Sequence, residues 1–207
     1  MKKIIVTISR QYGSGGREIG ERVATALDIP LYDKEIITAA AADGTLSEEV
    51  KTRSEEAANS LLYTLAMGSN VFGTQAHFGY RMPLNDKLFL LQSDVIRGYA
   101  RQGSCVIVGR CADYVLRDEK DILRIFVYGD IDFRYARIKD RHPDVKPGQI
   151  MDIINKTDKR RASYYNFYTG NKGGKLDNYD LALNASTLGI DGAAEAIIAA
   201  VKRKAGE

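Results

Sequence analysis

Phosphate chemistry is suggested first by a glycine-rich run near the amino end, Gly13-Ser14-Gly15-Gly16, which is followed by Arg17 and Glu18. Glycines let backbone amides converge, and a helix that begins directly after them presents unpaired N–H groups at its positive end. The run therefore predicts an anion site, with phosphate as the favoured ligand. A glycine-rich turn from strand to helix that binds no ligand is the alternative.

The side chains of this run differ from those of the lysine-bearing phosphate loop, G-x-x-x-x-G-K-[ST]. With Gly16 as the last glycine, Gln11, Arg17 and Glu18 replace the first glycine, the lysine and the hydroxyl residue. The planar fork of Arg17 can hold phosphate oxygens, or the side chain can simply be solvated. Glu18 is a candidate metal ligand, although a glutamate in the first turn of a helix is favourable without one. Ser14 can donate to a phosphate or serve in the turn.

Further arginines stand where a ligand of the same kind could reach them. Arg110 follows a short apolar strand, and the carboxyl ends of parallel strands border the ligand crevice of an open sheet. Arg134, Arg137 and Arg141 share one face of a helix by their spacing. A second basic cluster contains Lys156, Lys159, Arg160 and Arg161. Surface ion pairs and solvated helix faces are the alternative interpretations.

The elements that must position these residues alternate along the chain. Apolar, β-branched runs predict strands at about 3–9, 29–32, 104–109, 122–128 and 180–184. Helical periodicity predicts helices at 17–27, 86–102, 131–141, from Pro147 onward, and 191–204; Asp33 can cap a further helix, and helix formers fill 46–67. The segment 68–83 predicts an aromatic loop. This alternation favours a doubly wound parallel sheet with helical inserts.

Composition limits the remaining function classes. The chain has 207 residues, enough for one α/β domain, and its net charge of +3 comes from 30 basic and 27 acidic side chains, which does not indicate a nucleic-acid partner. Two cysteines, Cys105 and Cys111, fit neither a zinc site nor a disulfide framework. No apolar run is long enough to span a membrane or to form a signal segment. We expect a cytoplasmic protein.

Four stretches together resemble a known family. They are Ile8 to Gly20, Tyr32-Asp33-Lys34-Glu35, Val108-Gly109-Arg110, and Tyr164 to Gly170. Through them nearly the whole chain resembles the nucleoside monophosphate kinase group, and most closely a cytidylate kinase-like family. The resemblance implies a three-layer fold of the P-loop nucleoside triphosphate hydrolase type with a five-stranded parallel sheet, ATP and Mg²⁺ as cofactors, and phosphorylation of CMP or dCMP.

The resemblance also implies a division of the chain and roles for residues. The core would comprise 1–32, 96–141 and 176–207, with a monophosphate-binding insert at 33–95 and a lid at 142–175. The implied catalytic residues are Arg17, Arg137, Arg141 and Arg161. Cofactor binding falls to Gly13, Ser14, Gly15, Gly16, Arg17 and Glu18. The implied substrate-binding residues are Tyr32, Asp33, Lys34, Arg110, Asp158 and Arg160, with Asp33 as a plain helix cap the alternative.

Two departures leave other functions open. The loop lacks lysine and the hydroxyl residue, and Cys111 stands where authentic cytidylate kinases carry an aspartate after Gly-Arg. A nucleotide-binding sensor or adaptor that keeps the fold without transfer activity is therefore one alternative, and a kinase for another small acceptor is a second. The expected partners are small-molecule nucleotides. The aromatic segment 72–80 is a candidate homodimer contact.

Overall fold

The computed structural model describes residues 2–33, 36 and 84–206. Its centre is a five-stranded parallel sheet with the order β2-β3-β1-β4-β5. The strands are β1 (Ile5–Arg10), β2 (Leu31–Tyr32), β3 (Cys105–Val108), β4 (Ile122–Tyr128) and β5 (Leu181–Asn184). This confirms the predicted fold class and places each strand within a few residues of its expected position.

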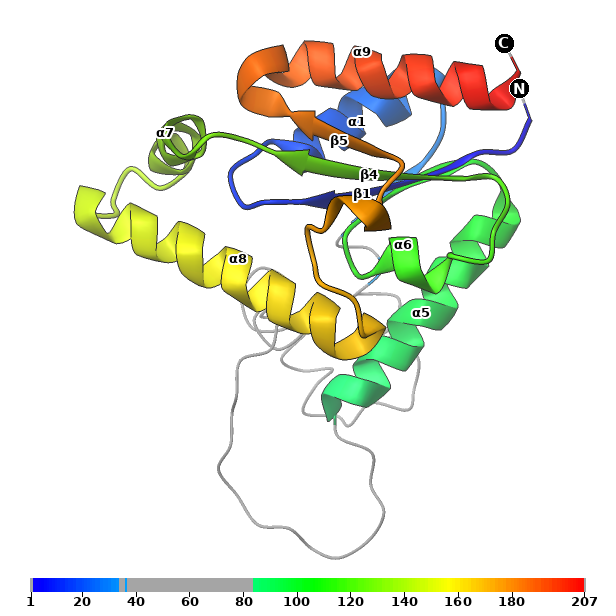
Figure 1. Cartoon of the computed structure of the whole chain (residues 1–207), viewed down its shortest axis with the longest axis horizontal. Helices are drawn as coiled ribbons and strands as arrows, with labels where there is room; N and C mark the ends of the chain where they lie inside the picture. Colours follow the sequence, from blue (N-terminus) through cyan, green and yellow to red (C-terminus); the bar gives the residue numbers. More distant parts are fainter. Residues whose placement is uncertain (1, 34–35, 37–83, 207) are drawn as a thin grey trace, which may run out of the picture.

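Helices cover both faces of this sheet (Figure 1). Two helices lie on one face, α1 (Gly16–Leu27) and α9 (Ala185–Ala205). The opposite side carries α5 (Leu84–Gln102), α6 (Ala112–Val115), α8 (Pro147–Thr169) and the short 3-10 helix η1 (Leu176–Asn178), with α7 (Ile131–Arg141) at one end of the sheet. The first four residues of β1 are buried, which fits their three isoleucine and valine side chains, because both faces of the strand are covered.

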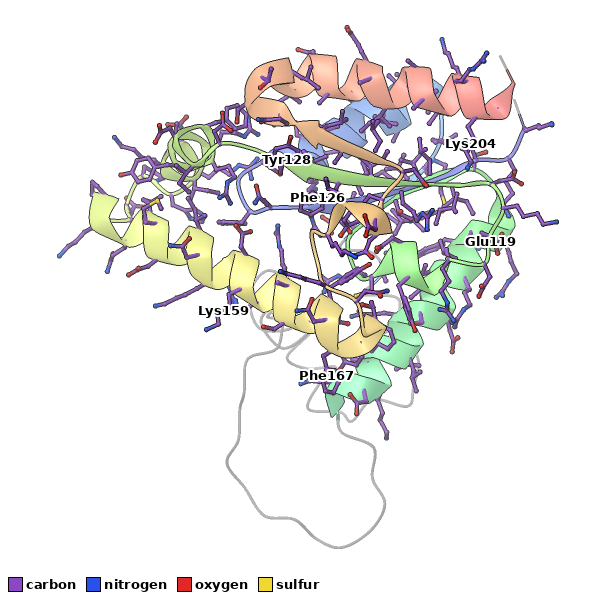
Figure 2. All side chains as sticks on the ribbon, viewed as in Figure 1. Glu119, Phe126, Tyr128, Lys159, Phe167 and Lys204 are labelled. Carbon is purple, nitrogen blue, oxygen red and sulfur yellow. The ribbon has the colours of Figure 1, made fainter. Side chains whose placement is uncertain are left out.

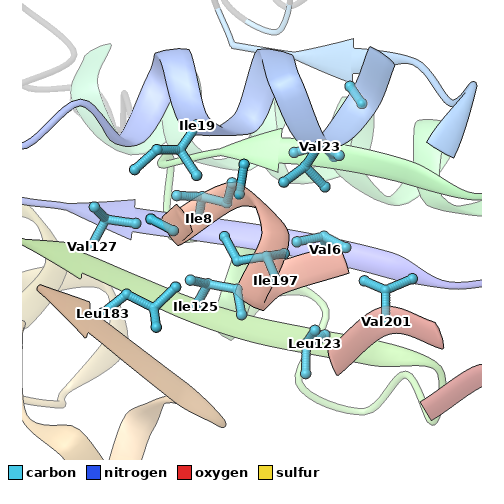
Figure 3. Close-up of a cluster of buried hydrophobic side chains, with 14 of the residues drawn as sticks. Val6, Ile8, Ile19, Val23, Leu123, Ile125, Val127, Leu183, Ile197 and Val201 are labelled. Carbon is cyan, nitrogen blue, oxygen red and sulfur yellow. The ribbon is translucent and has the colours of Figure 1, made fainter. Parts of the chain in front are cut away.

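The core on the first face joins the sheet to α1 and α9. Val6 and Ile8 point to this face from β1 and are fully buried against Ile19 of α1 and Ile197 of α9 (Figure 3). On the other face Ile5 packs with a second cluster that includes residues of α5 and α6. Alternate residues of β1 thus anchor helices on opposite sides, which fixes the end of β1 where the glycine-rich run begins.

The helix α8 is a single element of 23 residues that starts at Pro147, as the sequence predicts. Its first half packs Ile150 and Ile154 on Ile138 of α7, and these three side chains form a separate small core. The last helix begins at Ala185 rather than at Asp191, with a break at Gly189 where φ is +68°. The short helix α6 is not apparent in the sequence.

Several predictions concern residues outside the described ones. These are Lys34, most of the helix expected after Asp33, the helix formers at 46–67 and the aromatic loop 68–83. The insert at 33–95 and the lid at 142–175 stay predictions as units of the fold. Within residues 2–33, 36 and 84–206, none of the helices combines the length and the hydropathy that a bilayer span requires.

Candidate functional site

The glycine-rich run links β1 to α1, as the sequence predicts. Gly13 and Gly15 have positive φ angles of +81° and +85°. A Cβ at Gly13 would lie 2.9 Å from the carbonyl oxygen of Arg134, so this position also needs glycine for steric reasons. No described side chain caps the first turn of α1 at Gly15. The amides of this turn therefore keep the arrangement that suits an anion.

Ser14 serves the turn itself. Its hydroxyl is fully buried and lies 2.9 Å from the carbonyl oxygen of Gln11 and 3.1 Å from that of Val127 in β4, either of which can accept its proton. The side-chain oxygen of Gln11 in turn accepts the Gly129 amide at 3.1 Å. Ser14 and Gln11 thus connect the loop to the end of β4. Because the Ser14 hydroxyl donates to these backbone carbonyls, it is not directed at a phosphate on the loop.

Arg17, in the place of the usual lysine, lies on the surface of α1. Its Nε is 3.0 Å from Oε1 of Glu21 and 3.6 Å from Oδ2 of Asp33, which is buried at the end of β2. The side chain of Arg17 remains 44% exposed. Arg17 would have to leave these carboxylates before it could contact a phosphate on the loop.

Glu18 pairs with Arg137 across the loop. Its Oε2 accepts a hydrogen bond of 2.5 Å from Nη2 of Arg137, and its Oε1 lies 3.3 Å from Arg22. The Arg137 guanidinium holds the pKa of the Glu18 carboxyl below its usual range. A Cβ at Gly15 would lie 3.5 Å from Nη2 of Arg137, so this guanidinium stands directly beside the loop. Arg137, which the resemblance implies as a catalytic residue, therefore lies beside the glycine-rich loop.

Asp158 joins α8 to the same loop. Its Oδ1 accepts the backbone N–H of Tyr12 at 2.7 Å, and its Oδ2 lies 2.5 Å from Nη1 of Arg134. Arg134 is buried and also donates to the carbonyl oxygen of Tyr12 at 3.3 Å. The three arginines of the α7 face therefore have different surroundings, because Arg134 is buried in this network, Arg137 pairs with Glu18, and Arg141 is exposed in the last turn.

A cavity of about 330 Å³ lies beside the loop, between the carboxyl ends of the strands and α8. Its walls come from β1, β4, the turn after β3, α8 and the segment that follows α8. Arg10, Arg110 and Arg161 line it, and Asp158 is the one carboxylate among the described lining residues. Such an excess of positive charge in a partly enclosed space favours an anionic ligand. Arg110, singled out from its place after a strand, is among these residues.

The turn that carries Arg110 has an unusual backbone. Gly109, Arg110 and Cys111 all have positive φ angles, of +78°, +58° and +54°. Positive φ is unfavourable for residues with side chains, and strain of this kind often accompanies a functional site. The turn places Arg110, a residue that is 8% exposed, in the cavity wall. Burial raises the pKa of the Cys111 thiol. The thiol therefore stays protonated and unreactive, as is typical of a buried cysteine.

Arg161 lies between the cavity and the loop. Its Nη1 donates to the carbonyl oxygen of Arg10 at 3.2 Å, and its guanidinium carbon is 5.4 Å from the centre of the Tyr12 ring. Arg160, the next arginine in sequence, instead lies 3.4 Å from the hydroxyl of Thr157 and does not line the cavity. Of the two arginines expected to return from the lid, Arg161 alone is placed at the cavity.

Aromatic rings form the remaining wall of the cavity. Phe126 and Tyr179 stack with ring centres 4.9 Å apart. Tyr165 donates its hydroxyl to Oδ2 of Asp113 at 2.7 Å, and burial raises the pKa of this aspartate. Tyr164 also lines the cavity. A flat ring could lie against this wall while its anionic group meets the arginines.

Two of the expected substrate-binding residues, Tyr32 and Asp33 at the end of β2, lie outside the cavity lining. The Tyr32 ring stacks on Tyr99 of α5 with centres 3.7 Å apart, so it packs within the protein. Asp33 lies between Arg10 and Arg17, 3.7 Å from Nη2 of Arg10. Neither Tyr32 nor Asp33 lines the cavity.

The sequence interpretation missed Arg10, Asp113, Phe126 and Tyr179. Arg10 ends β1 just as Arg110 follows β3, and the rule that identified Arg110 applies to Arg10 as well. The aromatic wall has no comparable local signal, because its rings come from β4 and from the segment after α8.

The donor set bears on a metal ion. The described residues contain no group of three or more His, Cys, Asp or Glu side chains that could hold one. Mg²⁺ in kinases is typically bound by one or two carboxylates together with substrate phosphates. The loop offers Glu18, whose charge is shared with Arg137 and Arg22. Glu18 is therefore the carboxylate of the loop's first helical turn that could assist such an ion.

Comparison with known proteins gives a family and a fold. A sequence model of the cytidylate kinase-like family matches residues 5–187. No curated protein matches the chain. The crystal structure of an uncharacterized protein from Eubacterium ventriosum ATCC 27560 is similar over 97% of this chain and 99% of that one, with 27% identity and a TM-score of 0.72.

Two kinases share the fold at low identity. Shikimate kinase from Bacteroides thetaiotaomicron has a TM-score of 0.55 and 12% identity, over 97% of this chain and 99% of that one. A gluconokinase from Sinorhizobium meliloti 1021 has a TM-score of 0.52 and 14% identity, over 97% of this chain and 93% of that one. The likeness extends over the whole fold.

Proposed function

Because the chain belongs to the cytidylate kinase-like family, we propose that it transfers a phosphoryl group from ATP to CMP or dCMP with the help of Mg²⁺. The observation that carries this proposal is the cavity lined by Arg10, Arg110 and Arg161 directly beside the glycine loop. Phosphoryl transfer needs two anions held in line and positive charge around the group that moves. A loop of amides and an adjacent arginine-lined cavity supply both requirements.

The loop would hold the donor. The amides from Gly13 to Arg17 would receive the phosphates of ATP, and the Arg137 guanidinium beside Gly15 would add charge. Magnesium, held mainly by the phosphates and assisted by Glu18, would neutralise charge on the triphosphate. Glu18 and Arg137 would have to adjust their mutual hydrogen bond to take these roles.

The cavity would hold the acceptor. Arg110 would bind its phosphate, and the ring would lie against Phe126 and Tyr179. An acceptor oxygen forms a bond to the γ-phosphorus while the bond from that phosphorus to the leaving oxygen of ADP breaks. No general base is required, because a phosphate acceptor already carries an anionic oxygen at neutral pH. Arg161, which touches both loop and cavity, is suited to the transferred group.

A second candidate is a nucleotide-binding sensor without transfer activity. It is supported by the pairing within the loop, where Arg17 contacts Glu21 and Asp33, and Glu18 contacts Arg137. These side chains are engaged with each other rather than directed at a ligand. A kinase for another small acceptor is a third candidate, and the shikimate kinase and gluconokinase that share the fold suggest hydroxy acids for the test.

Turnover with a panel of acceptors distinguishes the three. The protein is incubated with ATP, Mg²⁺ and one acceptor at a time, from CMP, dCMP, UMP, AMP, GMP, shikimate and gluconate, and ADP is followed. ADP formation that depends on CMP or dCMP supports the proposal, and formation only with another acceptor supports the third candidate. Nucleotide binding without ADP supports the sensor. Arg17→Ala should abolish turnover in a kinase, whereas Arg97→Ala, an exposed pair with Asp94 on α5, should not.

A further inference from the structure

Arg10 lies in a slot between two glycines. A Cβ at Gly16 would lie 2.7 Å from Cβ and 3.1 Å from Cγ of Arg10. Gly16 begins α1 and is not one of the glycines with positive φ, so its backbone does not call for glycine. The stem of Arg10 does, because any larger residue at position 16 would press on it.

The charged end of the same side chain rests on the turn after β3. A Cβ at Gly109 would overlap Nη1 of Arg10 and lie 3.0 Å from its Cζ. Arg10 thus runs from the glycine loop to the strained turn that carries Arg110, and it lines the cavity on the way. Glycines on both sides give this one side chain a fixed path along the end of the sheet.

Asp33 holds the guanidinium at its far end. Nη2 of Arg10 is 3.7 Å from Oδ1 of Asp33, and Oδ2 of the same carboxylate is 3.6 Å from Nε of Arg17. Both distances exceed the usual length of an N–H···O hydrogen bond. The Asp33 carboxylate thus lies beside both guanidiniums, and Arg17 is also paired with Glu21. The side chain of Arg10 is 12% exposed and that of Asp33 is 6% exposed, so water screens their charges little.

We propose that Arg10 binds the anionic group of the acceptor together with Arg110, and that Asp33 is the residue that positions Arg10. The inference rests on the proposed function in taking the cavity as the acceptor site. A guanidinium can donate two parallel hydrogen bonds to two oxygens of one phosphate, a planar geometry that an ammonium group does not offer. The slot between Gly16 and Gly109 would keep that fork oriented toward the cavity.

The test measures KM and kcat for CMP in Arg10→Ala, Arg10→Lys and Asp33→Asn, with Arg97→Ala as the control. For Arg10→Ala we expect the KM for CMP to rise about tenfold or more, the loss of roughly one charge-assisted hydrogen bond. The KM for ATP should stay near the wild-type value. Arg10→Lys should recover only part of the loss, since the charge returns without the fork.

Asp33→Asn separates positioning from folding. If Asp33 acts through Arg10, its substitution raises the KM for CMP in the wild-type background but adds little to Arg10→Ala, so the two effects are not additive. Additive effects in the double variant would overturn the role given to Asp33. Thermal unfolding of each variant shows which of them fold. If Arg10→Ala does not fold, the KM of Arg10→Lys for CMP is the measurement that tests the role of Arg10.

Calorimetric titration with CMP and with inorganic phosphate keeps the outcomes distinct. If the wild type phosphorylates CMP and Arg10 variants keep its KM, the inference is overturned and the proposed function stands. If the wild type forms no ADP but binds CMP, and Arg10→Ala weakens that binding, the inference stands and the proposed transfer fails. A wild type that neither binds CMP or phosphate nor turns over overturns both.

Discussion

The glycine loop and the cavity beside it solve the problem of binding an anion in different ways. In the loop, each charged side chain of the first helical turn already has an opposite charge beside it, Arg17 with Glu21 and Glu18 with Arg137. Three arginines, Arg10, Arg110 and Arg161, line the cavity instead, and Asp158 is the one carboxylate among the described lining residues. The loop must rely on its backbone amides, whereas the cavity lining contains more basic than acidic side chains.

This difference suggests which residues supply the positive charge that a loop lysine would otherwise provide. A compact ammonium on the loop would serve the donor alone, whereas Arg161 touches Arg10 and Tyr12 at the loop and also lines the cavity. Asp158 has a similar double position, because it accepts the Tyr12 amide and also lines the cavity. Both residues belong to α8, so this helix connects the two regions.

After Arg17→Ala, which should abolish turnover, Arg161→Ala should have the largest effect on activity. Removal of one group that stabilises developing charge typically lowers kcat about 10²- to 10³-fold, and Arg161 is the arginine between loop and cavity. Steady-state ADP formation with CMP measures it. Lys159→Ala is the matched control, since Lys159 is exposed on the side of α8 away from the sheet (Figure 2). If both variants kept the wild-type kcat, Arg161 would have no part in transfer.

Asp158→Ala should have the next largest effect, on stability. It removes the acceptor of the Tyr12 amide and leaves the buried Arg134 without its carboxylate. Loss of hydrogen bonds to a charged group lowers the free energy of unfolding by about 2 kcal/mol, which urea denaturation at neutral pH can measure. Asp152→Ala changes an exposed aspartate of the same helix and should have little effect. An equal loss in the two variants would mean that Asp158 does not join α8 to the loop.

The sequence indicates the sheet better than it indicates the site. Apolar runs such as Ile4 to Ile8 are buried on both faces, and their hydrophobicity alone identifies them as strands. The end of a strand likewise identifies Arg110. Arg10 meets the same criterion, but it lies just before the glycine-rich run. The glycines there indicate binding by backbone amides, so the Arg10 side chain is easily overlooked.

The contacts that build the site could not be predicted locally. Asp158 and Tyr12 are 146 residues apart, and Tyr165 and Asp113 are 52 apart, so no spacing rule joins them. Ser14 fits a phosphate donor by its type, yet its hydroxyl points to backbone carbonyls because β4 ends beside the loop. Residue types favour phosphate binding, whereas the packing of α8 and β4 on the loop determines which side chains line the cavity.

Gly109→Ala should disturb the cavity and leave the loop largely intact. Alanine at a φ of +78° destabilises the protein by about 1–2 kcal/mol, and its Cβ would displace the guanidinium of Arg10. We expect a higher KM for CMP together with lower thermal stability. At Gly98 of α5 a Cβ meets nothing within 4 Å, so Gly98→Ala should keep the KM and match or exceed wild-type stability. An unchanged KM in Gly109→Ala would show that Arg10 is not needed where it lies.

Glu18→Gln should have the smallest effect on stability and act on the loop alone. The Arg137 hydrogen bond lowers the pKa of the Glu18 carboxyl in the folded protein. The pair therefore stabilises the protein fully at pH values above the pKa that Glu18 has in the unfolded chain, and this stabilisation is lost as the pH falls through the lowered pKa of the folded state. The side chains are 35% and 22% exposed, which limits the contribution to about 1 kcal/mol or less. Wild type and Glu18→Gln should thus differ in unfolding free energy at neutral pH and converge in acid. Glu195→Gln, an exposed site on α9, should show no such convergence. ATP binding without magnesium gives a second test of this variant. If the pairing with Glu18 keeps Arg137 from the phosphates, Glu18→Gln should bind ATP more tightly than the wild type. Weaker binding by the variant would instead make Glu18 part of the nucleotide site.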